Sequence, residues 1–216
     1  MKKKVLMSLL LLAIIGTSAV WAQTRVTEGN FTFQDHLGGG VQLSAVNNQI
    51  RGEVVVPSVA PNGRSVDQIA VGGYQNNTGI TSVILPNSVR IINNNAFRGC
   101  TGLTSIVIPE GVTNINDYSF QGCTGLTSVT IPASMVNINA QSFQDCTNLT
   151  SVTFMGSNTR LFSTVGRTPF DGDLRAKYLA GGAGTYTRSR NGTVWTKQAS
   201  TTVPCPHCNG TGVIRL

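Results

Sequence analysis

LTSIVIPEGVTNINDYSFQGCTG, residues 103–125, is a unit of 23 residues that recurs through the middle of the chain. Related units begin at Ile80, Leu126 and Leu149, and the complete copies place proline, phenylalanine and cysteine at matching positions. A fixed period of this length is typical of a solenoid, because one short unit cannot bury its apolar side without stacking on its neighbours. The repeat therefore predicts an elongated domain that presents an extended surface.

Each unit alternates its side chains in the way that a short strand requires. Ile106 and Ile108 point to one side of the predicted strand, whereas Ser105 and Val107 point to the other. Pro109 ends the strand because proline has no backbone N–H for a sheet ladder. Strands of successive units lie about 4.8 Å apart, so equivalent residues form columns. The largest predicted inward column contains Phe97, Phe120 and Phe143.

An altered repeat precedes the regular ones. The spacing from Pro57 to Pro86 is 29 residues instead of 23, which places an insertion within residues 58–65. The turn sequence Pro61-Asn62-Gly63 predicts that this insertion is a protruding loop. Before it, residues 31–33 and 41–43 alternate around three glycines, which predicts a hairpin that covers the first repeat.

The C-terminal side also carries signals for a cap. Residues 173–180 predict a short helix that ends at Gly181-Gly182, and Asn191-Gly192 predicts a tight hairpin between residues 185–188 and 193–196. The expected fold is therefore mainly β: a solenoid of repeats of about 23 residues, capped by hairpins at both ends.

The first 22 residues resemble a secretory signal peptide. Lys2, Lys3 and Lys4 precede the apolar stretch 5–15, and Ala22 offers a cleavage site after small residues. The apolar stretch is too short for a transmembrane anchor. We therefore expect a secreted, periplasmic or cell-surface protein that is cleaved after Ala22. The expected organisation is a signal peptide (1–22), an N-terminal β cap (23–49), the repeats (50–155), a C-terminal cap with a short helix and hairpin (156–198) and a flexible tail (199–216).

The repeats resemble a known family. Units such as residues 103–125, with their proline, their Val-x-x-Ile step and their Ser-Phe-x-x-Cys close, are similar to the BspA-like bacterial leucine-rich repeats. The stretch from Lys177 to Gln198 also resembles a C-terminal segment found in some members. This resemblance implies a curved leucine-rich-repeat solenoid that acts as an adhesin-like surface protein and binds host or bacterial partners.

The outward strand positions form the candidate binding face. Their hydroxyl groups and modest apolar stripe suit another protein or a glycan, although serine and threonine are also common on exposed strands for structural reasons alone. Few charges occur between residues 80 and 154, which argues against nucleic acid as a partner. The face consists of Ser82, Ile84, Ser105, Val107, Ser128, Thr130, Ser151 and Thr153.

Three of the five cysteines, Cys100, Cys123 and Cys146, belong to the repeat. We interpret this column as filler of the interior, because cysteine is small and apolar. Parallel thiols in adjacent strands suit neither a tetrahedral metal site nor a disulfide.

The tail contains the sequence CPHCNGTG, residues 205–212, which resembles one copy of the CxxCxGxG zinc motif of DnaJ-type chaperones. Cys205 and Cys208 supply two thiolates, which is half of a structural zinc site. No cofactor is required by the fold, so zinc here would be shared with a second chain, as in a homodimer through the tail. A disulfide or redox pair, and a tail with no function, remain alternatives.

The remaining polar residues do not predict catalysis. Neither His36 nor His207 flanks a plausible nucleophile, and no pair of carboxylates stands out, so we expect a protein that is not an enzyme. The basic residues near the C-terminus are interpreted as a solvated surface of the cap. These residues are Arg160, Arg167, Arg175, Lys177, Arg188, Arg190 and Lys197.

Overall fold

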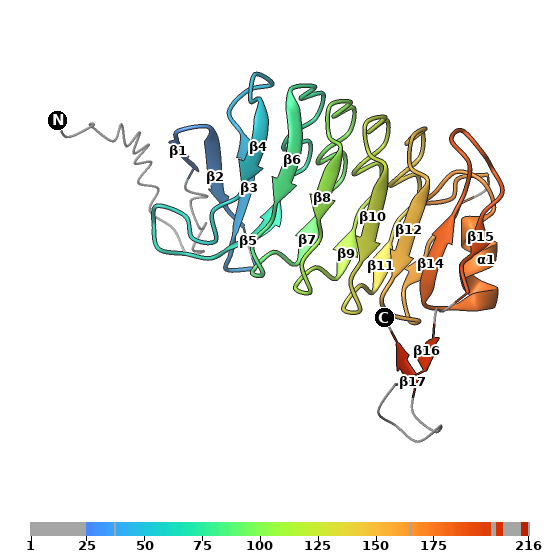
Figure 1. Ribbon diagram of the computed structural model, residues 1–216. Helices are drawn as coiled ribbons and strands as arrows, with labels where there is room; N and C mark the ends of the chain where they lie inside the picture. Colours follow the sequence, from blue (N-terminus) through green and yellow to red (C-terminus); the bar gives the residue numbers. More distant parts are fainter. Residues whose placement is uncertain (1–24, 37, 165, 200–201, 205–212, 216) are drawn as a thin grey trace.

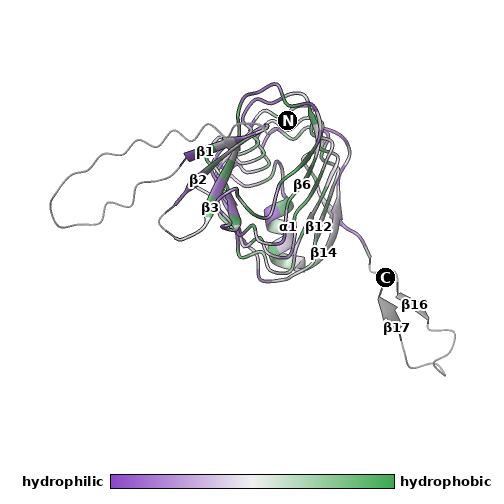
Figure 2. Ribbon diagram, turned by 90° about the vertical axis from the view of Figure 1, so that its left-hand side faces the viewer, coloured by the Kyte–Doolittle hydropathy of each residue, from purple (hydrophilic) through white to green (hydrophobic). Residues whose placement is uncertain are grey.

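The computed structural model describes residues 25–36, 38–164, 166–199, 202–204 and 213–215. Successive repeats stack into a solenoid, along which Figure 1 follows the chain from the first strands to the C-terminal helix. Figure 2 shows the two walls of this stack from one end. The predicted solenoid is thus confirmed, and the predicted signal peptide, residues 1–22, lies outside the described residues.

The strands of one wall, here called the front strands, come from the part of each repeat that precedes the proline, and they pair in parallel as β4–β6–β8 and β10–β12. They are β4 (Gly52–Val55), β6 (Ile80–Ile84), β8 (Ser105–Val107), β10 (Ser128–Ile131) and β12 (Ser151–Phe154).

The back strands follow the proline and pair in parallel through the whole stack. They are short because only the Val-x-x-Ile step of each repeat is extended. They are β5 (Val66–Ile69), β7 (Ile91–Ile92), β9 (Asn114–Ile115), β11 (Asn137–Ile138) and β13 (Arg160–Leu161).

Five aromatic rings form a continuous stack inside the solenoid. Neighbouring ring centroids are 4.8 to 5.2 Å apart, and the ring planes differ by at most 10°. Each ring is essentially inaccessible to solvent, so the predicted inward column is confirmed. The register of the back strands fixes this spacing, because each repeat advances the stack by one strand. The stacked residues are Tyr74, Phe97, Phe120, Phe143 and Phe170.

Asparagine side chains form a second column beside the back strands. Asn116 Nδ2 donates to Asn93 Oδ1 at 3.3 Å, and Asn139 Nδ2 donates to Asn116 Oδ1 at 3.4 Å. Ser119 and Ser142 hydroxyls donate to the backbone oxygens of Asn116 and Asn139 in the same turns. The asparagines of this column thus hydrogen-bond to one another between copies, as stacked amide ladders do.

The N-terminal cap extends the back strands only. The predicted hairpin is confirmed as β2 (Phe31–Asp35) and β3 (Val41–Ala45), which pair antiparallel, and β3 then pairs in parallel with β5. A further strand, β1 (Arg25–Glu28), adds to the outer edge of β2 and was not predicted. The cap is therefore a three-stranded meander.

The inserted loop between β4 and β5 folds onto this cap. Val59 and Ser65 form an isolated antiparallel bridge that closes the loop. Arg64 Nη1 lies 3.1 Å from Asp35 Oδ1, and Asn62 Nδ2 donates to the same oxygen at 3.1 Å. The six extra residues therefore hold the cap against the first repeat.

The C-terminal cap contains the only helix among the described residues. The helix α1 (Leu174–Gly181) is followed by β14 (Gly184–Thr187), which pairs antiparallel with β12, and by β15 (Thr196–Lys197), which pairs with β14. The predicted tight hairpin is wrong, although a turn does form at Asn191, where the Gly192 N–H donates to Ser189 O at 2.8 Å. Thr187 pairs with Thr196, so the two strands are joined by the long loop 188–195, because Trp195 is drawn into the core instead of continuing a strand.

Two further strands occur in the part of the tail that was expected to be flexible. The backbones of β16 (Thr202–Pro204) and β17 (Val213–Arg215) pair antiparallel, with Pro204 opposite Val213. Within the described residues, α1 has eight residues, and no helix is long and apolar enough to cross a membrane.

Candidate binding face

The predicted outward residues lie in two columns on the front strands. Ser82 pairs with Ser105 and Ile84 with Val107, while the same positions pair between β10 and β12 as Ser128 with Ser151 and Thr130 with Thr153. Figure 1 shows β10 following β8 on the same side of the stack, although the two belong to separate ladders. The structure therefore brings all eight residues to one side.

The two halves of this face differ in chemistry. Ile84 and Val107 are 43% and 66% exposed and lie side by side in adjacent strands, so they form a continuous apolar patch. At the C-terminal half the same column contains Thr130 and Thr153. Thr153 is half-buried, because β14 pairs alongside β12 and the Thr153 and Thr185 hydroxyls lie 2.9 Å apart. The face is thus apolar at one end and hydroxyl-rich at the other.

Both columns continue beyond the residues that the sequence predicted. On β4, Glu53 pairs with Ser82 and Val55 with Ile84, and Val55 is 57% exposed. The alternation around the buried Val54 and Val56 could have revealed both residues. On β14, Thr185 and Thr187 oppose Thr153 and Ser151. This extension could not be predicted, because the sequence does not show that β14 turns back antiparallel.

The cysteine column lies in the interior, as predicted. Cys100, Cys123 and Cys146 are free thiols without exposed surface. Each sulfur donates to the backbone oxygen of an aromatic residue in the preceding repeat at 3.0 to 3.2 Å. Burial raises the pKa of Cys100 to about 12 and also raises the pKa values of the other two thiols. These cysteines are therefore unreactive filler.

His36 forms a contact that the sequence did not reveal. Its Nε2 lies 2.8 Å from Asp67 Oδ1, and its Nδ1 accepts the Gly38 N–H at 3.1 Å. A histidine base in a catalytic triad would direct its second nitrogen to a nucleophile. Here that nitrogen is occupied by the backbone, so the pair fastens the N-terminal cap to β5.

Arg188 corrects the interpretation of the C-terminal basic residues as a solvated surface. Only 8% of Arg188 is exposed, and its guanidinium donates from Nε to Leu149 O at 2.7 Å and from Nη2 to Cys146 O at 3.0 Å. Nη1 donates to Gly192 O at 2.8 Å, and the Trp195 ring centroid lies 4.7 Å from the guanidinium carbon. Arg188 therefore ties the loop 188–195 to the backbone oxygens of Cys146 and Leu149 at the end of the last repeat.

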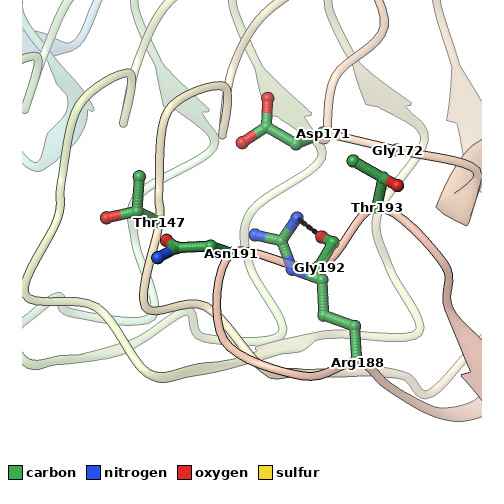
Figure 3. Close-up of a pocket in the computed structure, with 7 residues that line it drawn as sticks. All are labelled: Thr147, Asp171, Gly172, Arg188, Asn191, Gly192 and Thr193. Atoms are coloured by element: carbon green, nitrogen blue, oxygen red, sulfur yellow. Dashed lines mark hydrogen bonds between the residues drawn. The ribbon is translucent and has the colours of Figure 1, made fainter.

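A recess of about 290 Å³ opens beside this guanidinium, and Figure 3 shows its lining. It is formed by the end of the last repeat, the segment before α1 and the loop between β14 and β15. Burial raises the pKa of Asp171, although Arg188 opposes that change. The lining residues are Thr147, Asp171, Gly172, Arg188, Asn191, Gly192 and Thr193.

The predicted metal ligands Cys205 and Cys208 lie outside the described residues. Within the described ranges, no group of three or more histidine, cysteine or acidic side chains is arranged to hold a metal ion.

Comparisons with known proteins agree with this geometry. Residues 67–168 match six copies of the family model described as BspA type leucine rich repeat region. A leucine-rich repeat protein from Bacteroides capillosus is similar in structure, with 25% identity and a TM-score of 0.50, and the match covers 61% of this chain and 99% of that chain. The search of curated proteins gave no match.

Two other solved structures resemble the chain less closely in overall superposition. The leucine-rich repeat protein of T. pallidum is 26% identical, with a TM-score of 0.48 and coverage of 57% of this chain and 68% of that chain. A leucine rich cell surface protein from Faecalibacterium prausnitzii is 22% identical, with a TM-score of 0.49 and coverage of 63% and 44%. The repeat region of this chain, residues 67–168, belongs to the BspA type of leucine-rich repeats.

Proposed function

We propose that this chain is a secreted or cell-surface binding protein, adhesin-like in role, whose front strands present a face to another protein. The observation that carries the proposal is the exposed aliphatic column formed by Val55, Ile84 and Val107. Aliphatic side chains on a solenoid wall are normally turned inward, and a solvent-exposed apolar stripe bordered by hydroxyl groups is typical of a protein-binding surface.

The composition of the face also favours a protein over a nucleic acid. Glu53 is its only charged member, since all eight predicted positions and the two threonines of β14 are uncharged. Binding would therefore rest on apolar burial and hydroxyl hydrogen bonds, and would change little with salt. A glycan partner would use the hydroxyl-rich half instead, where Thr130, Thr153 and Thr185 lie together.

The test is a capture experiment with surface extracts of host and bacterial cells. Val107→Asp places a charge in the centre of the apolar column and should weaken capture at least tenfold, which corresponds to about 1.4 kcal/mol. Val71→Asp is the matched control, because Val71 is also 66% exposed but lies just after a back strand. Equal loss in both variants, or full retention with Val107→Asp, would reject this face.

Thr130→Asp combined with Thr153→Asp tests the hydroxyl-rich half in the same way. Loss of capture only in this double variant would place the contact in the C-terminal half and favour a glycan partner.

Protease treatment of intact cells tests display at the surface, because a binding protein that is displayed there can be cleaved from outside. N-terminal sequencing of the secreted form should begin at Gln23 if the first 22 residues are removed.

A second role, favoured by the pairing of β16 with β17, is a zinc- or thiol-dependent module in the tail. Cys205 and Cys208 have the Cys-x-x-Cys spacing of a zinc knuckle and would supply two thiolates, which is half of a structural zinc site. Metal analysis should then find about half a zinc per chain, lost together with dimerisation in Cys205→Ser. A protein that contains neither zinc nor a Cys205–Cys208 disulfide would exclude this role.

A further inference from the structure

The recess at the C-terminal end of the solenoid is separate from the front face and is built from three segments. Figure 3 shows the Arg188 guanidinium among side chains of the last repeat, the segment before α1 and the loop 188–195. Gly172 closes one side, where a Cβ atom would lie only 2.0 Å from Thr193 O. The walls are therefore fixed by close backbone packing.

Arg188 has hydrogen-bond donors to spare in this recess. A guanidinium carries five N–H groups. Three of them donate to Leu149, Cys146 and Gly192 oxygens, one from each nitrogen. One N–H therefore remains on Nη1 and one on Nη2, in a side chain that is more than nine-tenths buried and that lines the recess. Buried donors of this kind require an acceptor.

Acceptors and hydroxyl groups surround those donors. Asp171 Oδ2 accepts the Asp145 N–H at 3.0 Å, while Oδ1 has no hydrogen-bond partner within the described part of the chain. The side chains of Thr147, Asn191 and Thr193 likewise make no hydrogen bond to the described residues, although all three line the recess. Four side chains therefore offer unused polar atoms around one small volume.

We propose that this recess binds one polyhydroxylated small molecule, such as a single sugar residue. One hydroxyl oxygen of a vicinal diol would accept from the free Arg188 N–H groups, and the neighbouring hydroxyl would donate to Asp171 Oδ1. A carboxylate or phosphate ligand suits the recess less, because Asp171 balances the charge of Arg188 and would repel an anion. A volume of about 290 Å³ is at the small end for ligand pockets, which fits one sugar ring.

The indole of Trp195 provides the signal for a test. Its Nε1 donates to Asp171 O at 2.9 Å, and its ring stacks on Arg188, so a molecule in the recess should change its fluorescence and its indole N–H resonance. Trp21→Phe in the full-length chain leaves Trp195 as the single tryptophan. The probes are glucose, galactose, mannose and N-acetylglucosamine, each titrated separately. At least one should give a saturable change.

Two variants then locate the binding. Thr193→Val removes a lining hydroxyl, and Asn191→Gly removes the amide while preserving a backbone with φ of 57°. Each should weaken binding about tenfold. Thr124→Val is the matched control, since Thr124 occupies the position of Thr147 one repeat earlier and lies outside the recess. The control should bind as the parent does.

Three outcomes would overturn the proposal. The absence of a saturable change with every sugar would show that the recess does not take this class of ligand. An equal effect of Thr124→Val would place the binding elsewhere on the repeats. Competition by sodium acetate at constant ionic strength would show that Arg188 attracts anions, and that the assignment of a neutral polyol is wrong.

Discussion

The two ends of the solenoid are sealed in different ways. At the N-terminal end, the meander β1–β2–β3 continues the back strands, and partly exposed polar pairs such as Asp35 with Arg64 fasten it. At the C-terminal end, β14 and β15 continue the front strands, and the buried Arg188 takes carbonyl oxygens of the last repeat. The N-terminal end is thus covered by additional strands, whereas the C-terminal end depends on additional strands and on one buried cation, Arg188.

The two ends should also differ in how their stability is distributed among residues. Backbone ladders distribute their contribution over many bonds, so no single side chain of the N-terminal cap should be decisive. A buried guanidinium with three hydrogen bonds and an aromatic partner concentrates a large contribution in one residue, because hydrogen bonds to charged groups are stronger than neutral ones. The C-terminal end should therefore be far more sensitive to substitution.

The largest effect is expected for Arg188→Met. It leaves the oxygens of Leu149, Cys146 and Gly192 without this donor, and should lower the free energy of unfolding by about 3–5 kcal/mol in urea denaturation. Arg190→Met is the control, because Arg190 is exposed and its one side-chain hydrogen bond to the described residues is to Asn148; it should cost at most about 0.5 kcal/mol. Equal stability of the two variants would falsify the distinction between the ends.

Thiol labelling tests whether the C-terminal end of the repeats opens more readily than the N-terminal end. Because the pKa of Cys100 is raised from 9.0 to about 12, its thiolate population at pH 8 should be about a thousandfold below that of an ordinary thiol. Cys100, Cys123 and Cys146 should all resist iodoacetamide in the native protein, as mass spectrometry can show. In Arg188→Met, Cys146 should become reactive before Cys100. The opposite order would mean that the stack opens first at its N-terminal end.

Removing the hydroxyl group from two buried tyrosines should change the stability of the protein in opposite directions and by smaller amounts. Tyr74, at the N-terminal end of the aromatic stack, has a buried hydroxyl without a partner among the described residues, so Tyr74→Phe should stabilise the protein by about 1 kcal/mol. Tyr178 in α1 accepts the Thr159 N–H at 3.1 Å and donates to Gly156 O at 3.0 Å. Tyr178→Phe should destabilise by about 1 kcal/mol. Thermal unfolding that changes in the same direction for both would contradict this assignment.

The smallest effect is expected at the ion pair between Arg64 and Asp35, which joins the inserted loop to the N-terminal cap. Arg64→Met removes an ion pair with Asp35 that is partly exposed to solvent, so it should cost only about 0.5 kcal/mol, and less in high salt. Chemical denaturation at two ionic strengths checks both expectations. A loss as large as that of Arg188→Met would show that the loop 58–65 supports the cap more strongly than its contacts indicate.

Much of the fold could be predicted because the same pattern of apolar, proline and cysteine positions recurs in several repeats. Three copies of the phenylalanine and cysteine positions defined the inward columns, and all of these residues are buried in the structure. Alternation around Pro109 defined which strand residues face outward. The helix was placed to within a residue, because Gly181-Gly182 marks its end.

Single-copy features could not be predicted in the same way. In the sequence, Arg188 is one of several basic residues that we expected at the surface. It is buried at the end of the last repeat because β14, which precedes it, pairs antiparallel with β12. The loop 188–195 misled prediction because Asn191-Gly192 is a strong turn signal, although burial of Trp195 outweighs the formation of a tight hairpin. The recess beside Arg188 depends on both of these events.

The sequence alone thus determined the period, the interior columns and the outward columns, because these follow from local alternation repeated at a constant interval. The fold was needed to show which wall each cap extends, how far the outward columns reach and that a cation lies at the C-terminal end. Those features depend on contacts between segments far apart in the chain, such as Arg188 with Cys146, for which no repeated pattern exists.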